Sequence, residues 1–164
     1  MAYHLDEINR RIDQDVKGFL AECDAAYAEK IGGAADVILA NLSTCPIVLL
    51  SGPSGSGKTT TALKIEEELE RRGVRSHTIS MDNYFKTLNK ETAPRAADGS
   101  IDYESPLCMD MDLLRQHFTK LSQGETIEIP HFEFARQMRN DAPGTPLRLG
   151  KDEIAIFEGI HALN

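Results

Sequence analysis

Two adjoining stretches decide the fold of this chain: Pro46-Ile47-Val48-Leu49-Leu50 and Gly52-Pro53-Ser54-Gly55-Ser56-Gly57-Lys58-Thr59. The first is a continuous apolar run, which is typical of a strand buried on both faces of a parallel sheet. The second matches the pattern G-x-x-x-x-G-K-[ST] at every fixed position. Residues 58–72 then show helical periodicity, with an apolar side formed by Ala62, Leu63, Ile65 and Leu69, and Gly73 as a stop. Strand, glycine-rich turn and helix together predict a phosphate-binding loop.

The chemistry of such a loop follows from its residue types. Glycines let the backbone wrap closely around a phosphate group, and the start of the following helix adds a positive pole. Lys58 would reach the β- and γ-phosphates of ATP, and the Thr59 hydroxyl would bind Mg²⁺. The predicted nucleotide-binding residues are Gly52, Pro53, Ser54, Gly55, Ser56, Gly57, Lys58, Thr59 and Thr60.

The remaining segments predict an α/β fold. In chain order we expect a second strand over 74–81, a long irregular region over 86–109, a helix over 110–122, an exposed or edge strand over 125–134, a loop carrying Pro143, Gly144 and Pro146, and an apolar strand over 153–158 that Gly159 ends. This order indicates a parallel sheet of the P-loop NTPase type, flanked by helices.

Two carboxylates end predicted strands beside this loop. Asp82 follows the second strand, and a base there could take the proton of an acceptor hydroxyl as ATP loses its γ-phosphoryl group. Glu158 ends the last strand, where an acid can hold Mg²⁺ directly or through water, in the Walker-B role. A GTPase is disfavoured because the near match Asn89-Lys90-Glu91-Thr92 has Thr where a guanine-reading motif needs Asp.

Residues 1–40 predict a helical extension to a main unit over 41–164. Apolar residues recur at helical spacing from Leu5 to Ile31, and we expect Gly32-Gly33 to interrupt the helix. The extension either packs on the main unit or joins two copies of the chain into a homo-oligomer. It holds eight acidic and four basic residues, half of the net charge of −8.

The composition excludes several classes of protein. An acidic chain with 27% charged residues is a poor general binder of nucleic acid or of anionic membranes. No apolar run is long enough to span a membrane, and the N-terminus has no apolar signal core. Cys23, Cys45 and Cys108 are odd in number and widely spaced, which indicates reduced thiols in a cytoplasmic protein.

An ordered set of motifs resembles the uridine kinase branch of the uridine kinase/phosphoribulokinase family of P-loop kinases. The resemblance covers residues 46–163 and rests on GPSGSGKTT at 52–60, SMDNYF at 80–85, DYESPLCMDMDLL at 102–114, IPHFEF at 129–134 and IFEGIHAL at 156–163. It implies a kinase that uses ATP and Mg²⁺ to phosphorylate a small molecule. Within it, Asp82 falls on the catalytic aspartate and Glu158 on the glutamate after the Walker-B strand.

The resemblance also suggests substrate residues. Glu104, with Asp102 as the alternative, stands where the family binds sugar hydroxyls, and Tyr84 and Phe85 follow the catalytic aspartate. Phe132 and Gln137 stand where uridine-specific members have Tyr and His, so they could stack on a base and bind its edge with a changed hydrogen-bond pattern. Arg136 and Arg139 either meet an acidic substrate or form surface ion pairs.

The acceptor and the extent of the domain are the open questions. The leading expectation is a nucleoside kinase; the alternatives are a kinase of another alcohol, such as a sugar phosphate, and a nucleotide-binding module without turnover. The family continues after the Walker-B strand with a lid that carries arginines, and the sequence ends at Asn164. We therefore expect a kinase domain that is truncated before its lid, and this fragment alone could lack activity.

Overall fold

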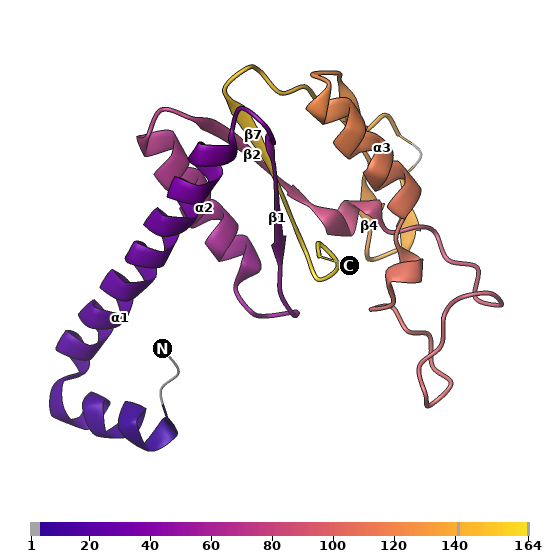
Figure 1. Cartoon of the computed structure of the whole chain (residues 1–164). Helices are drawn as coiled ribbons and strands as arrows, with labels where there is room; N and C mark the ends of the chain where they lie inside the picture. The colour runs from indigo at the N-terminus through magenta and orange to yellow at the C-terminus, as the bar shows by residue number, and fades with distance from the viewer. Residues whose placement is uncertain (1–3, 141, 164) are drawn as a thin grey trace.

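The computed structural model describes residues 4–140 and 142–163 and shows a three-stranded parallel sheet between two layers of helices (Figure 1). Strand β7 (Glu153–Gly159) lies between β1 (Ile47–Ser51) and β2 (Arg75–Ser80). In the register, Glu158 pairs with Leu50 on one side and with Ser80 on the other. The carboxyl ends of all three strands therefore meet at one edge of the sheet, as the α/β prediction requires.

The middle strand owes its position to its side chains. Ile154 and Ile156 point into a core on one face of the sheet, and Ala155 and Phe157 point into a core on the other. All four are at most 1% exposed. A strand that is apolar on both sides can be stable only where both faces are covered, so β7 takes the centre.

Helices α1 (Leu5–Asn41) and α2 (Lys58–Arg71) cover the first face. The predicted apolar side of α2 is largely confirmed, because Ala62, Ile65 and Leu69 are buried. Leu63 is the exception, because it is 50% exposed. Gly73 ends the helix with φ of +84°, and the Val74 N–H donates to the Leu69 carbonyl, as in a glycine-terminated helix.

Helix α3 (Met111–Ser122) covers the second face, on the opposite side of the sheet in Figure 1. Leu114 and Leu121 are buried, and the Phe118 ring meets the edge of Phe157 with 4.8 Å between ring centroids. Asp110 caps this helix, since its carboxylate accepts the Leu113 N–H at 3.1 Å.

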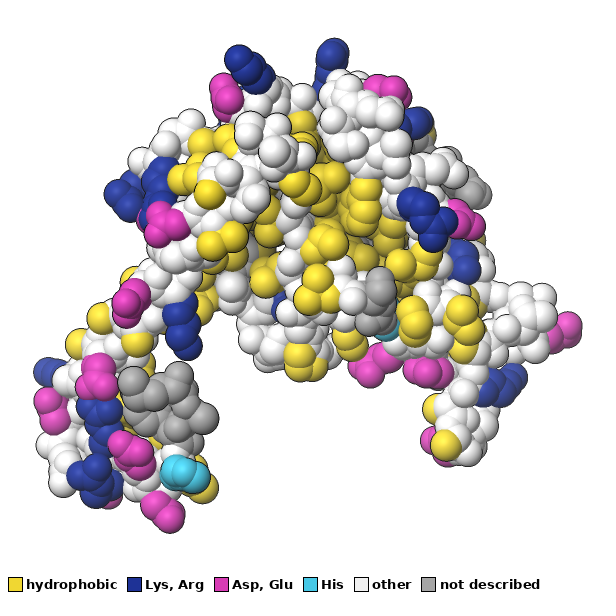
Figure 2. Space-filling view, viewed as in Figure 1, with side chains coloured by type: hydrophobic (Ala, Val, Ile, Leu, Met, Phe, Trp, Pro, Cys, Tyr) yellow, Lys and Arg dark blue, Asp and Glu magenta, His cyan; other side chains and the backbone are white. Residues whose placement is uncertain are grey.

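Strand β1 differs from the sequence expectation. It was expected to be buried on both faces, yet in the described residues it forms an edge of the sheet and Leu49 is 38% exposed. Figure 2 shows hydrophobic side chains gathered on this side of the molecule, between the two helical layers. An apolar run therefore located the strand but not its place in the sheet order.

Two short antiparallel strand pairs replace the single strand predicted over 125–134. Strand β3 (Ile127–Ile129) pairs with β6 (Thr145–Leu147), and β4 (Phe132–Glu133) pairs with β5 (Met138–Arg139), both antiparallel. Pro130 separates β3 from β4, because proline has no N–H to continue a ladder. The predicted loop after residue 142 was also wrong in part, since Thr145–Leu147 is a strand that pairs through Pro146.

Helix α1 does not break at Gly32-Gly33, as the sequence suggested. It runs through both glycines and kinks instead at Asp15, whose ψ of 83° is not helical and whose carboxylate accepts the Gly18 N–H at 3.0 Å. Asp15 thus caps the longer, second part of the helix. The first part, residues 5–14, lies apart from the body of the molecule in Figures 1 and 2, and both Leu5 in this part and Leu20, just after the kink, are more than half exposed.

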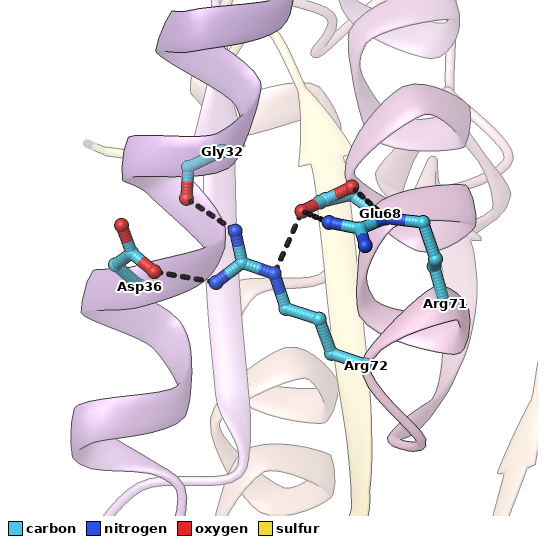
Figure 3. Close-up of polar contacts among 5 residues, drawn as sticks. All are labelled: Gly32, Asp36, Glu68, Arg71 and Arg72. Atoms are coloured by element: carbon cyan, nitrogen blue, oxygen red, sulfur yellow. Dashed lines mark hydrogen bonds and ion pairs between the residues drawn. The ribbon is translucent and has the colours of Figure 1, made fainter.

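Arg72 joins the second part of α1 to the end of α2 (Figure 3). Its guanidinium donates to the Asp36 carboxylate, to the Gly32 carbonyl at 3.2 Å and to the Glu68 carboxylate at 2.7 Å. Hydrogen bonds from Arg71 and Arg72 lower the pKa of Glu68 to about 2. The last turns of α1, residues 31–39, therefore pack on the main unit, and the Gly32 carbonyl accepts a hydrogen bond in this contact.

In the described ranges, no helix is long and apolar enough to cross a membrane. The three cysteines are free, and Cys108 is buried.

Candidate active site at the carboxyl edge of the sheet

The glycine-rich loop, residues 52–57, links the end of β1 to the start of α2. Gly55 and Gly57 have φ of +73° and +83°, a region that residues with a side chain rarely adopt. A Cβ on Gly52 would lie 2.8 Å from the Ser56 hydroxyl. These positions need glycine, and the backbone they shape has the form of an anion-binding turn before a helix.

Lys58 and Thr59 open α2 and turn toward different partners. The Lys58 ammonium donates to the Pro53 carbonyl at 3.0 Å, which folds the side chain back over the loop. The Thr59 hydroxyl donates to the Glu158 carboxylate across 3.4 Å. Glu158 is 7% exposed. The two residues predicted to hold the metal ion are thus brought together from positions 99 residues apart.

Asp82 lies at the same edge, just after β2. It is the second residue of the short 3-10 helix η1 (Met81–Tyr84), and its N–H donates to the Ser80 hydroxyl at 3.4 Å. Burial raises the pKa of Asp82 and the nearby charge of Glu158 raises it further, while Lys58 and His161 act in the opposite direction. The aspartate, the lysine and the glutamate of the prediction therefore share one electrostatic environment.

His161 belongs to this neighbourhood and was not singled out from the sequence. It is 5% exposed, follows β7 by two residues, and lies close enough to Asp82 to affect its pKa. The sequence did offer a signal for His161. It comes three residues after Glu158, and the chain that leaves β7 has to pass the carboxyl edge of the sheet.

A cavity of about 570 Å³ lies next to this segment, and Phe85, three residues after Asp82, is part of its lining. The rings of Phe85, Phe132 and Phe134 form one wall, with centroids 5.0 to 6.1 Å apart. Gln137 lines the cavity with φ of +51° at the tip of the β4–β5 hairpin. The other lining residues are Lys86, Thr87, Leu88, Lys90, Ile101, Tyr103, Ala135, Arg136 and Met138.

The charged residues of this cavity are all basic. Lys86, Lys90 and Arg136 line it, and no Asp or Glu does so among the described residues. Arg136 also pairs with Glu133 at 3.4 Å, and this pair is solvent-exposed on the arginine side. A cationic rim and an aromatic wall thus adjoin the end of η1.

Tyr84 was predicted to contact substrate, and the structure places it in the core instead. Its side chain is fully buried, and its hydroxyl lies 2.9 Å from Nδ1 of His117. Burial raises the pKa of Tyr84 strongly. The first aromatic after the aspartate therefore faces inward, and only Phe85 reaches the cavity.

For Arg139 the sequence leaves two alternatives, contact with an acidic substrate or a surface ion pair. The structure shows the ion pair: its guanidinium donates to the Asp110 carboxylate at 2.8 Å and to the Tyr84 carbonyl at 3.2 Å. Arg139 does not line the aromatic cavity.

The predicted sugar-binding carboxylates lie in the irregular region before η2 (Pro106–Cys108). Asp102 accepts the Glu104 N–H at 3.1 Å, so it shapes the turn, while Glu104 is exposed. Tyr103, between them, lines the cavity, whereas neither carboxylate does. Contact of Glu104 or Asp102 with sugar hydroxyls stays a prediction.

The chain is similar in sequence to known proteins. The model of the phosphoribulokinase / uridine kinase family matches residues 47–164. Over 114 residues, 70% of this chain, the sequence is 39% identical to a uridine kinase of Schizosaccharomyces pombe and covers 24% of that protein. Over 115 residues, again 70% of the chain, it is 30% identical to a uridine kinase of Halobacterium salinarum and covers 48% of it. The chain thus spans about a quarter to a half of these curated relatives.

Solved structures share the fold. A possible uridine kinase from Bacillus stearothermophilus superposes with a TM-score of 0.64 over 83% of this chain and 72% of that one, at 20% sequence identity. A putative fructose transport system kinase from Silicibacter sp. TM1040 gives 0.61 over 79% of this chain and 62% of that one, at 22% identity. At such identities the likeness concerns the α/β architecture.

Proposed function

The chain belongs to the phosphoribulokinase/uridine kinase family, and from that membership we propose that it transfers the γ-phosphoryl group of ATP to a hydroxyl of a small molecule. The observation that carries the proposal is the meeting of the phosphate loop, Asp82 and Glu158 at one edge of the sheet. In open α/β sheets, ligands bind at that edge.

The loop would bind the phosphates of ATP. Backbone N–H groups of residues 52–57 and the positive end of α2 offer donors to a polyanion, and Lys58 adds a mobile charge. In a chain of net charge −8, this local field is what makes a nucleotide site possible.

Thr59 and Glu158 would hold Mg²⁺. A hydroxyl and a carboxylate within 3.4 Å of each other are the hard oxygen donors that this ion prefers. When bound, Mg²⁺ neutralises charge on the transferred phosphoryl group. Glu158 is otherwise a buried acid, and a cation beside it would balance its charge.

Asp82 would act as the general base. As the acceptor oxygen forms its bond to the γ-phosphorus and the bond to ADP breaks, the hydroxyl proton passes to the Asp82 carboxylate. Asp82 is half-buried near the start of η1, and Phe85, the residue that follows this short helix, lines the cavity.

A nucleoside is the leading acceptor. The rings of Phe85, Phe132 and Phe134 offer faces on which a base could stack, and the Gln137 amide could bind its edge. The sequence relatives named above are uridine kinases. Glu104 or Asp102 would contact the ribose hydroxyls.

A second acceptor class is an alcohol that carries an anionic group, such as a sugar phosphate. Lys86, Lys90 and Arg136 favour it, since they give the cavity three basic side chains, and no acidic one lines it in the part of the chain that the structure describes. This class differs from a neutral nucleoside in one measurable respect: its binding weakens as salt screens the charges.

Acceptor-dependent release of ADP tests the proposal. The protein with ATP and Mg²⁺ is offered uridine, cytidine, fructose and ribulose 5-phosphate, and calorimetry measures ATP binding separately. Turnover with at least one of these acceptors supports a kinase. ATP binding without ADP release for the whole panel would contradict the proposal and favour the non-catalytic nucleotide-binding module.

A cytoplasmic location and self-association through α1 remain proposals. Exposed apolar side chains on both sides of the kink in α1 support association of two copies; they are Leu5, Ile12, Val16 and Leu20. Light scattering of the protein and of a variant with Leu20→Glu would test it, because a dimer that uses this face should dissociate in the variant.

A further inference from the structure

Arg139 binds two segments that are far from it in the sequence, residues 84–87 and Asp110. Its guanidinium donates to the Asp110 carboxylate at 2.8 Å and to the Tyr84 carbonyl at 3.2 Å. Its own N–H donates to the Thr87 hydroxyl at 2.9 Å. One residue of β5 thereby contacts the end of η1, the residues after it and the cap of α3.

These contacts converge on the backbone that carries Asp82. Tyr84 is the last residue of η1, in which Asp82 is the second, and its carbonyl accepts both the Arg139 guanidinium and the Asp110 N–H at 2.9 Å. Both hydrogen bonds are therefore made to the same carbonyl, at the end of η1. Arg139 and Asp110 thus fix the carboxyl end of the short helix that presents the base.

The same arginine holds the wall of the cavity. Arg139 pairs with Phe132 across the β4–β5 hairpin, and Gln137 lies two residues before it. Each strand of this hairpin has two residues, too few for a hairpin to be stable by itself. The position of the hairpin relative to η1 therefore depends on side-chain contacts. The hydrogen bonds of Arg139 are directional contacts of this kind.

The Arg139–Asp110 bridge is partly buried. The side chains of Arg139 and Asp110 are 25% and 26% exposed, in contrast to the Arg115–Asp112 pair on α3 at 75% and 85%. Burial acts to raise the pKa of Asp110, but hydrogen bonds from Arg139 and Leu113 outweigh it and the pKa is lowered. Partly buried, two-point contacts of this kind constrain geometry more than exposed pairs do.

We propose that Arg139, held by Asp110, is a positioning residue that sets the acceptor cavity at the right distance from Asp82. The inference rests on the proposed function, because that function assigns the base and the cavity. Arg139 acts through Tyr84 and the hairpin, without touching the acceptor. Misplacement of a reacting group by about 1 Å can cost about a hundredfold in rate.

Steady-state kinetics of four variants test this role. Arg139→Gln removes the charge and one arm of the fork, Arg139→Lys keeps the charge, and Asp110→Asn keeps a cap for Leu113 while removing the acceptor charge. Arg115→Gln, which breaks the exposed pair on α3, is the matched control.

We expect Arg139→Gln and Asp110→Asn each to lower kcat by about tenfold or more, with the KM for ATP nearly unchanged. The double variant should be no slower than the worse single one, since both remove one bridge. Arg139→Lys should recover part of the rate, and Arg115→Gln should match the wild type. An unchanged kcat in Arg139→Gln, or a loss of ATP binding in parallel with kcat, would overturn the proposal.

Hydrogen exchange gives a readout that does not depend on turnover. In Arg139→Gln we expect faster exchange both in the hairpin and at the Asp110 and Phe85 amides near the end of η1. Faster exchange confined to residues 132–139, with η1 unaffected, would show that Arg139 only closes the hairpin. A wild type without turnover would instead contradict the proposed function, and the exchange result would still decide the role of Arg139. If Arg139→Gln does not fold, Asp110→Asn carries both measurements.

Discussion

The hydroxyl of Thr59 and the carboxylate of Glu158 lie 3.4 Å apart, although 99 residues separate them in the chain. Thr59 is the second residue of α2, and Glu158 is the sixth residue of β7. The parallel register of β1 and β7 produces this contact, because it places Glu158 opposite Leu50, just before the phosphate loop. The strand order thus places two oxygen ligands side by side at the carboxyl edge of the sheet, next to the phosphate loop.

This pair leads to a prediction about magnesium. Glu158→Gln should raise the Mg²⁺ concentration needed for half-maximal turnover, because a neutral amide is a weaker ligand for a hard cation than a carboxylate. Thr59→Ala should have the same direction of effect, and Thr59→Ser should resemble the wild type. The measurement is ADP release against Mg²⁺ concentration. An unchanged magnesium dependence in Glu158→Gln would remove it from the metal site.

The second prediction concerns the base. Asp82→Asn should lower kcat by about 10²–10⁴-fold, the range that general-base catalysis contributes. ATP binding measured by calorimetry should stay near normal, because the role proposed for Asp82 is at the acceptor hydroxyl and not at the nucleotide. Asn has nearly the same volume, so the turn at η1 should persist. Turnover close to that of the wild type would exclude Asp82 as the base.

The sequence predicted the part of the site whose geometry is local. A strand, the motif at 52–59 and a helix follow one another directly, so their spacing alone places Lys58 and Thr59. Asp82 and Glu158 could be placed as well, because each ends a strand and parallel strands end at one edge.

The remainder depends on packing that no local pattern reveals. Tyr84 and Phe85 are adjacent aromatics, yet η1 turns one into the core and the other into the cavity. Arg139 found its partner Asp110 on another element, 29 residues away. Spacing in the sequence could not tell a substrate arginine from a bridging one.

The third prediction concerns the acceptor cavity. Phe132→Ala should raise the acceptor KM about fivefold or more, since stacking of a base on an aromatic ring is worth about 1–3 kcal/mol. The KM for ATP should not change. Leu107→Ala serves as a control, because Leu107 is 70% exposed and lies outside the cavity lining. Equal acceptor KM values in both variants would place the acceptor elsewhere.

The fourth prediction separates the two leucines of α2. Leu69 is fully buried and Leu63 is 50% exposed, although both were expected on the apolar side. Leu69→Ala should lower the free energy of unfolding by about 2–5 kcal/mol, the usual cost of a buried leucine. Leu63→Ala should cost less than about 0.5 kcal/mol, as exposed substitutions do. Chemical denaturation measures both, and similar losses would contradict the packing of α2.

The fifth prediction concerns the acid dependence of stability. Glu153 begins β7, and its carboxylate accepts the Gly150 N–H at 3.0 Å, lies 3.1 Å from His77 Nε2 and pairs with Arg75 at 2.9 Å. The Gly150 and His77 hydrogen bonds hold the pKa of Glu153 below its ordinary value of 4.5. A carboxyl whose pKa is lowered by folding stabilises the fold above its unfolded pKa, and this contribution is lost as the pH falls through the folded pKa.

Glu153→Gln should therefore lower Tm most at neutral pH, and the difference from the wild type should shrink as the pH falls below 4.5. The neutral amide keeps an acceptor for Gly150 but loses the charge that Arg75 meets. Glu125→Gln, at an exposed glutamate before β3, is the matched control and should change Tm little. Thermal unfolding of the three proteins across the acid range measures this. If the difference in Tm between Glu153→Gln and the wild type grew on acidification, its sign would be opposite to the prediction. The ionised Glu153 carboxylate would then not stabilise the fold.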